Sequence, residues 1–199
     1  MLQYYIDNPK YIFLLAALVL LTVFVIFKAA KASMKRSREN EKIINRLKEE
    51  NKLRNEFAVL TDEIVKEAEP ERLFKGVALN LQKRVADKED MASEFESLED
   101  WQKYVYALSV FLEDSETKMS DFFRLNTQPL TGQALRGMNV IIGGRLAEIF
   151  SEEFNQFDEE NEEISLDESR ISVLDGEASK LFEDCSAAKT VGEYIKSVL

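Results

Sequence analysis

The feature of this sequence that most constrains its fold is an uncharged apolar segment from Tyr11 to Phe27. Thirteen of its 17 residues are Leu, Ile, Val or Phe. As a helix it extends roughly 26 Å at about 1.5 Å per residue, a little less than a ~30 Å hydrocarbon core. Lys10 and Lys28 can reach the two interfaces and make up the difference. The segment therefore predicts a transmembrane helix at 11–27, preceded by a short extracytoplasmic N-terminus at 1–10.

Two other interpretations of this segment stay open. A cleaved signal peptide normally begins with basic residues, whereas Asp7 is the only charged side chain before Lys10. The tripeptide at 30–32, Ala-Lys-Ala, nevertheless resembles a small-residue cleavage site. A buried core helix is the second interpretation, although such helices are seldom apolar on every face over this length. The transmembrane helix is the interpretation that the segment favours.

Basic residues follow the apolar segment closely, whereas a single lysine precedes it. The basic flank consists of Lys28, Lys31, Lys35, Arg36 and Arg38. By the positive-inside rule, the N-terminus lies outside and everything after Lys28 lies in the cytoplasm. This predicts a single-pass protein of the cytoplasmic membrane. The same five side chains can hold anionic headgroups at about 1 kcal/mol each, so membrane lipid is an expected partner.

The rest of the chain has the composition of a helical protein. Of its 199 residues only 7 are Gly and 3 are Pro, while 32% are charged. No run of alternating β-branched residues is long enough to indicate a sheet, so we expect an all-α fold. The charge is divided, because residues 1–85 carry a net charge of +5 and residues 86–199 a net charge of −16. The acidic half predicts either a solubilising surface or recognition of a basic partner, and no direct binding of nucleic acid.

Residues 28–69 are expected to form the basic flank and a helical stalk. Nothing breaks a helix from Asn40 to Glu69. Leu53, Phe57, Leu60 and Ile64 follow one another at the 4-3-4 spacing of a coiled-coil seam. Two interpretations stay open: the stripe packs on the chain's own domain, or it forms a weak homodimer.

Residues 70–199 predict an acidic helical bundle domain. Pro70 is typical of a first helical turn, and Ser97 with Asp100 resembles a capping box ahead of an aromatic-rich helix. Gly143-Gly144 interrupts the helical pattern. Further helices are expected at 119–125, 131–142 and 145–154, and in the C-terminal region.

An acidic loop, DEENEEISLDES, is predicted at residues 158–169. Its carboxylates are the candidate partner contacts: Asp158, Glu159, Glu160, Glu162, Glu163, Asp167 and Glu168. The loop lacks the glycine and the alternating ligand spacing of an EF-hand, so it predicts no calcium site. It is either an electrostatic recognition element or a solubilising one.

The residues of several common active sites are missing. The chain has no histidine and one cysteine, Cys185, which excludes Ser-His-Asp and Cys-His sites and a zinc cluster. It contains no glycine-rich phosphate-binding motif. Glu152 and Glu153 form a pair of a kind too common in this acidic chain to indicate general acid–base catalysis. We therefore expect no enzymatic activity and no cofactor.

Several segments of the C-terminal half carry a resemblance to a known family. They are WQKYVYALSVFLED (101–114), MSDFFRLNT (119–127), ALRGMNVIIGGRLAEIF (134–150), LDGEASKLF (174–182) and VGEYIKSVL (191–199). Residues 99–199 resemble a bacterial family of small acidic helical domains that includes a DNA-mimic protein. The family's Asn-Gly-Gly turn is absent from this chain, where residues 115–118 read SETK. The resemblance implies a helical fold, and it implies DNA mimicry less directly.

The sequence as a whole predicts a membrane-anchored, non-enzymatic interaction module that presents its acidic domain to a cytosolic protein partner. The alternative is a DNA mimic or anti-regulator, whose carboxylates occupy the phosphate-binding groove of a basic nucleic-acid-binding protein.

Overall fold

The computed structural model describes residues 40–157, 166–184 and 186–199, and the single residues Leu18, Leu21, Lys28 and Arg36. These residues form helices and the turns between them, with no strand, so the described part of the chain is all-α as its composition predicts. No helix among them is long and apolar enough to cross a membrane. The predicted transmembrane segment, 11–27, lies outside the described residues apart from Leu18 and Leu21, which are helical and 61% and 64% exposed.

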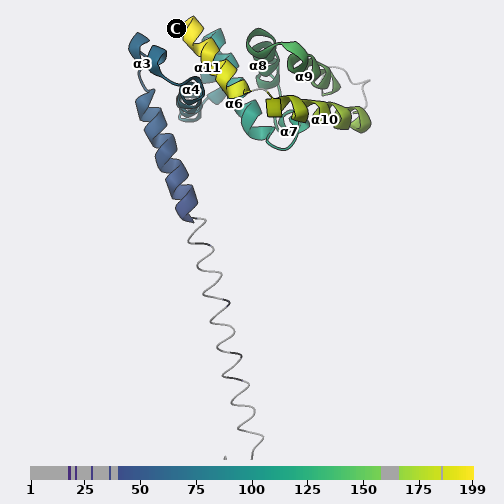
Figure 1. The fold of residues 1–199 in the computed structure, drawn as a ribbon, viewed down its shortest axis with the longest axis horizontal. Helices are drawn as coiled ribbons and strands as arrows, with labels where there is room; N and C mark the ends of the chain where they lie inside the picture. Colours follow the sequence, from purple (N-terminus) through teal and green to yellow (C-terminus); the bar gives the residue numbers. More distant parts are fainter. Residues whose placement is uncertain are drawn as a thin grey trace, which may run out of the picture. The chain divides into compact units, whose positions relative to one another are not determined.

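The chain divides between Glu49 and Glu50 into two units. Residues 40–56 form a helix that crosses this division. In the first unit, Ile43, Ile44 and Leu47 of this helix are exposed. The second unit, Glu50–Leu199, holds the hydrophobic core and all the labelled helices (Figure 1).

The helix predicted from Asn40 to Glu69 is interrupted, so that prediction is wrong. The helix ends at residue 56, and α3 (Asp62–Glu67) starts after a turn with Thr61 as its N-cap. The Asn80 side-chain amide donates hydrogen bonds of 3.0 Å to the carbonyl oxygens of Arg54 and Phe57. These contacts satisfy carbonyl groups left without partners where the helix ends. Sequence periodicity does not register a partner that lies 23 residues further along the chain.

The apolar stripe predicted for the stalk lies within the second unit and packs on its core. Phe57 is 2% exposed, and Leu53, Leu60 and Ile64 are partly buried against the core. Of the two interpretations of this stripe, the structure has the one in which it packs on the chain's own domain. Residues that the sequence assigned to the stalk thus complete the core of the domain.

Two helices that are far apart in the sequence pack closely, α4 (Pro70–Ala86) and α11 (Ala187–Val198) (Figure 1). Pro70 occupies the first turn of α4, as predicted, and the Glu69 carboxylate caps that turn. Gly192 of α11 faces the backbone of Pro70 so closely that a Cβ atom would stand 1.9 Å from the Pro70 carbonyl oxygen. Only a residue without a side chain fits at this contact.

Two helices follow α4 in the chain, α5 (Met91–Glu96) and α6 (Asp100–Asp114). The sequence did not predict α5. The expected capping box is displaced: Glu99 is the N-cap of α6 and completes the box with Gln102, whereas Ser97 ends α5.

The remaining helices are α7 (Met119–Leu125), α8 (Leu130–Gly137), α9 (Gly144–Gln156) and α10 (Glu168–Asp184). The boundaries predicted for α7 are confirmed. The helix predicted at 131–142 is α8 followed by a π-helical turn, η1 (Met138–Ile142). Gly143 and Gly144 then adopt φ angles of 66° and 60°, which glycine tolerates without strain, so the chain turns sharply into α9.

A cluster of phenylalanines joins α6, α7, α9 and α10. Phe111 is fully buried, and its ring lies 5.4 Å from Phe122, 5.1 Å from Phe150 and 5.7 Å from Phe182. Edge and tilted ring contacts of this kind add to the free energy gained by burial. The cluster fixes the part of the domain from which the acidic segment departs.

Candidate functional site

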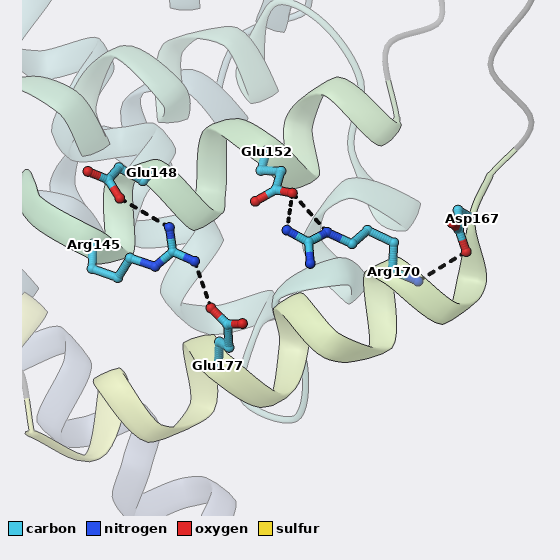
Figure 2. A network of polar contacts seen from close by, with 6 residues as sticks. All are labelled: Arg145, Glu148, Glu152, Asp167, Arg170 and Glu177. Atoms are coloured by element: carbon cyan, nitrogen blue, oxygen red, sulfur yellow. Dashed lines mark hydrogen bonds and ion pairs between the residues drawn. The ribbon is translucent and has the colours of Figure 1, made fainter.

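The helices on either side of the acidic segment are joined by a network of ion pairs, which we call the α9–α10 face (Figure 2). Arg145 of α9 contacts Glu148 of the same helix at 3.1 Å and Glu177 of α10 at 2.8 Å. Arg170 of α10 donates from Nε to Glu152 of α9 at 2.8 Å. Glu148, Glu152 and Glu177 are therefore paired with guanidinium groups of the same domain, which compensate their negative charge.

Two of the predicted partner contacts, Asp167 and Glu168, have partners within the domain. Asp167 caps α10, because its carboxylate accepts hydrogen bonds from the backbone amides of Ser169 and Arg170 at 3.0 and 3.1 Å. Glu168 accepts hydrogen bonds of 2.8 and 2.9 Å from the guanidinium of Arg124 in α7. The other five, Asp158, Glu159, Glu160, Glu162 and Glu163, lie outside the described residues.

Arg124 contacts both flanks of the acidic segment. Besides its bonds to Glu168, its guanidinium carbon lies 5.3 Å from the centre of the Phe157 ring. Phe157 also stacks on Phe123, with the ring centres 5.5 Å apart and the planes 13° apart. The hydrogen bonds to Glu168 raise the pKa of Arg124 above its ordinary value, which keeps the guanidinium charged. Two adjacent residues of α7 thus hold the residue before the segment and the start of the helix after it.

Sequence reasoning missed a buried carboxyl group, that of Glu153 in α9. Its side chain is fully buried, and neither carboxyl oxygen has a hydrogen-bond partner. Burial and then the charge of Asp175 in α10 raise the pKa of Glu153 to about 8, with a smaller contribution from Asp121 and an opposing one from Arg124. Glu153 therefore carries a proton at neutral pH.

The spacing of the apolar residues in α9 contains the signal that would have revealed Glu153. The buried apolar side chains Leu146, Ile149 and Phe150 define the inward stripe of this helix. Residue 153 lies four positions after Ile149 and three positions after Phe150, so it falls on the same stripe. Position on the helix, rather than the pairing of two adjacent glutamates, distinguishes buried Glu153 from Glu152.

A small pocket of about 200 Å³ lies between α10 and the turn that precedes α7. Ser115, Lys118, Asp175 and Phe182 are among its lining residues. Asp175 is already engaged there, because its two oxygens accept from the backbone amide and the hydroxyl of Ser120, each at 2.9 Å. In the part of the chain that the structure describes, no group of three or more Cys, Asp or Glu side chains is arranged to hold a metal ion.

Of the predicted membrane flank, Lys28 and Arg36 are described, and both are helical and exposed. Lys31, Lys35 and Arg38 lie outside the described residues.

No family model, curated protein or solved structure matches this chain. The resemblance of residues 99–199 to the acidic helical family stays a prediction, and function is inferred from the chain's own residues.

Proposed function

We propose that this chain is a single-pass membrane protein that presents an acidic segment to a cytosolic protein partner with a basic surface, and that it catalyses no reaction. The observation that carries this proposal is the way α7 holds both flanks of the segment. Arg124 contacts Phe157 on one side and Glu168 on the other. Between these residues, positions 158–163 contribute five carboxylates and no basic residue.

The distribution of charge around the segment supports the same function. On the α9–α10 face, Arg145 and Arg170 compensate carboxylates that would otherwise add to the negative field. Residues 158–163 contribute further negative charge to this region, because they include five carboxylates and no basic residue. Clustered charge of one sign steers a partner of opposite charge and raises the association rate.

The acidic segment leaves the second unit far from the point where the chain enters this unit. Within the second unit, α3 lies at one end, and the end of α9 and the start of α10 lie at the other (Figure 1). Residues 50–61, which lead into α3, are therefore well separated from the two flanks of the acidic segment.

A DNA mimic is less well supported. Mimicry needs a row of uncompensated carboxylates that reproduces the charge spacing of a duplex, about one charge per 1.7 Å of axis. Glu148, Glu152 and Glu177 of the α9–α10 face instead pair with arginines. We therefore place the partner's contact at residues 158–163.

The recognition part of the proposal is tested in membranes containing the full chain. Glu159, Glu160, Glu162 and Glu163 are changed to Gln, and the matched control changes Glu63, Glu67, Asp87 and Glu89, exposed carboxylates elsewhere in the domain, to their amides. Cross-linked partners are quantified by mass spectrometry at low and high salt. We expect the first variant to capture roughly tenfold less of its basic partners than the wild type captures. High salt should reduce capture by the wild type to a similar extent. Equal capture by both variants would contradict electrostatic recognition.

The membrane part is tested separately. A reporter that is active only in the cytoplasm, fused after Leu199, should be active, and the chain should resist extraction with carbonate. The uncharged, apolar composition of residues 11–27 supports this expectation. Release of a shortened soluble form would instead favour the signal-peptide interpretation.

A further inference from the structure

We propose that α10 is a releasable element whose closed position requires Glu153 to remain protonated. Glu153 lies where α7, α9 and α10 meet, with a side chain that is 0% exposed. Both of its carboxyl oxygens are buried without a hydrogen-bond partner. An ionised carboxylate in this position would be an unpaired buried charge, which protein interiors do not tolerate.

The charged groups that face Glu153 come from two helices. From α10 comes Asp175, and from α7 come Asp121 and Arg124. Two of the three are carboxylates, and Asp175 is itself held by Ser120. Among the described residues that act on Glu153, the cation is Arg124, which is bound to Glu168. On α9 itself, Glu148 and Glu152 pair with arginines of the α9–α10 face.

These surroundings leave the junction two states. Either Glu153 keeps its proton and the three helices stay packed, or it loses the proton and gains water by opening the junction. Burial and the neighbouring carboxylates raise its pKa to about 8, so the exchange between the two states responds to pH within the neutral range.

α10 is held by apolar side chains on one face and by ion pairs at the surface. Ile171, Leu174 and Ala178 are buried, and Leu181 and Phe182 pack partly buried against the core. Three ion pairs also hold α10: Arg124–Glu168, Arg145–Glu177 and Arg170–Glu152. Their side chains are 37–66% exposed, so each pair contributes little in water. Release of α10 would uncover the side of Phe111 that faces Phe182.

The proposal is tested by the accessibility of a buried thiol on α10. In the full chain in nanodiscs, with Cys185→Ser as background, Ala178→Cys reports on α10 and Ala107→Cys reports on α6. Both positions are at most 1% exposed, and both substitutions are small. Labelling rates are measured from pH 6 to 7.5, and each is divided by the rate of the same variant in denaturant. This division removes the intrinsic titration of the thiol.

We expect Ala178→Cys to label at least about tenfold faster than Ala107→Cys, with a corrected rate that rises about tenfold per pH unit. Adding Glu153→Met, or Glu153→Gln if the first variant does not fold, should abolish this rise, because neither residue can ionise. Equal rates at the two positions would mean that α10 opens only when the whole domain unfolds, and would overturn the proposal. A rise with pH that persists without Glu153 would overturn it as well.

Discussion

Two interfaces within the domain differ in what holds them. Between α4 and α11, Gly192 approaches the backbone of Pro70 so closely that no side chain fits between them, and Val191 and Ile195 are fully buried. Where α10 meets α7 and α9, the interface instead includes the buried Glu153, the bond of Asp175 to Ser120, and exposed ion pairs. The buried side chains of the first interface are apolar and close-packed, whereas the second interface includes a buried titratable group among its apolar side chains.

The difference shows which part of the domain can respond to solution conditions. Apolar packing depends little on pH, since no proton is gained or lost when it forms. An interface that includes a buried carboxyl group changes in stability wherever its folded and unfolded protonation states differ. The α4–α11 interface is therefore expected to keep the domain folded while the α10 interface opens and closes.

The largest expected effect comes from adding one methyl group at the apolar interface. Gly192→Ala forces its Cβ onto the backbone of Pro70 and should destabilise the domain by more than about 3 kcal/mol, the upper end for overpacking. The matched control is Gly176→Ala in α10, where a Cβ would meet no atom within 4 Å. This change should stabilise by about 0.5–1 kcal/mol, because alanine favours a helix. Denaturant unfolding of the two variants measures both values.

Effects of the same sign for these two substitutions would contradict the difference in packing between the two interfaces. A destabilising Gly176→Ala would mean that α10 is packed as closely as α11.

A somewhat smaller effect is expected from removing the buried acid. The pKa of Glu153 is raised from 4.5 to about 8, so the folded domain holds a proton that the unfolded chain releases across this range. Stability therefore falls as the pH rises from 4.5 to 8, at up to about 1.4 kcal/mol per unit. Glu153→Met should remove this slope. Its free energy of unfolding, relative to that of the wild type, should therefore rise by about 3 kcal/mol between pH 5.5 and 7.5.

Unfolding midpoints of the wild type and of Glu153→Met over this range measure the difference. Parallel stability profiles for the two proteins would show that Glu153 is ionised in the folded state, and would rule out a buried neutral acid at the junction.

The smallest effect is expected from the surface network. Arg145→Gln removes the ion pairs with Glu148 and Glu177, whose side chains are 67% and 41% exposed. Such pairs contribute about 0–1 kcal/mol, so unfolding free energy should fall by less than about 1 kcal/mol and this loss should vanish at high salt. A loss of several kcal/mol that is insensitive to salt would show that the network, rather than the apolar interior, holds α10.

The sequence predicted the helical class and several helices from local signals alone. Pro70 marked the start of α4, and the pattern of 119–125 matched α7. The interruption after residue 56 was not predicted, because it depends on hydrogen bonds from Asn80, which is distant in sequence.

The candidate site was less accessible to sequence reasoning. Composition drew attention to residues 158–168, but it did not reveal that Asp167 caps a helix or that Glu168 binds Arg124. Glu153 was overlooked because a glutamate was judged by its neighbour in sequence and not by its place on the inward stripe of α9. Burial and the charges nearby determine its protonation, and both follow from tertiary contacts.

A carboxyl titration measures the protonation state of Glu153 in the folded domain. The full chain is labelled with ¹³C at glutamate side-chain carboxyl carbons, and the Glu153 resonance is assigned by its absence from Glu153→Met. Its chemical shift, followed from pH 4 to 9.5, should titrate with an apparent pKa of about 8. A Glu153 resonance that titrates near 4.5 would contradict a neutral buried acid, because the junction would then hold a carboxylate at neutral pH.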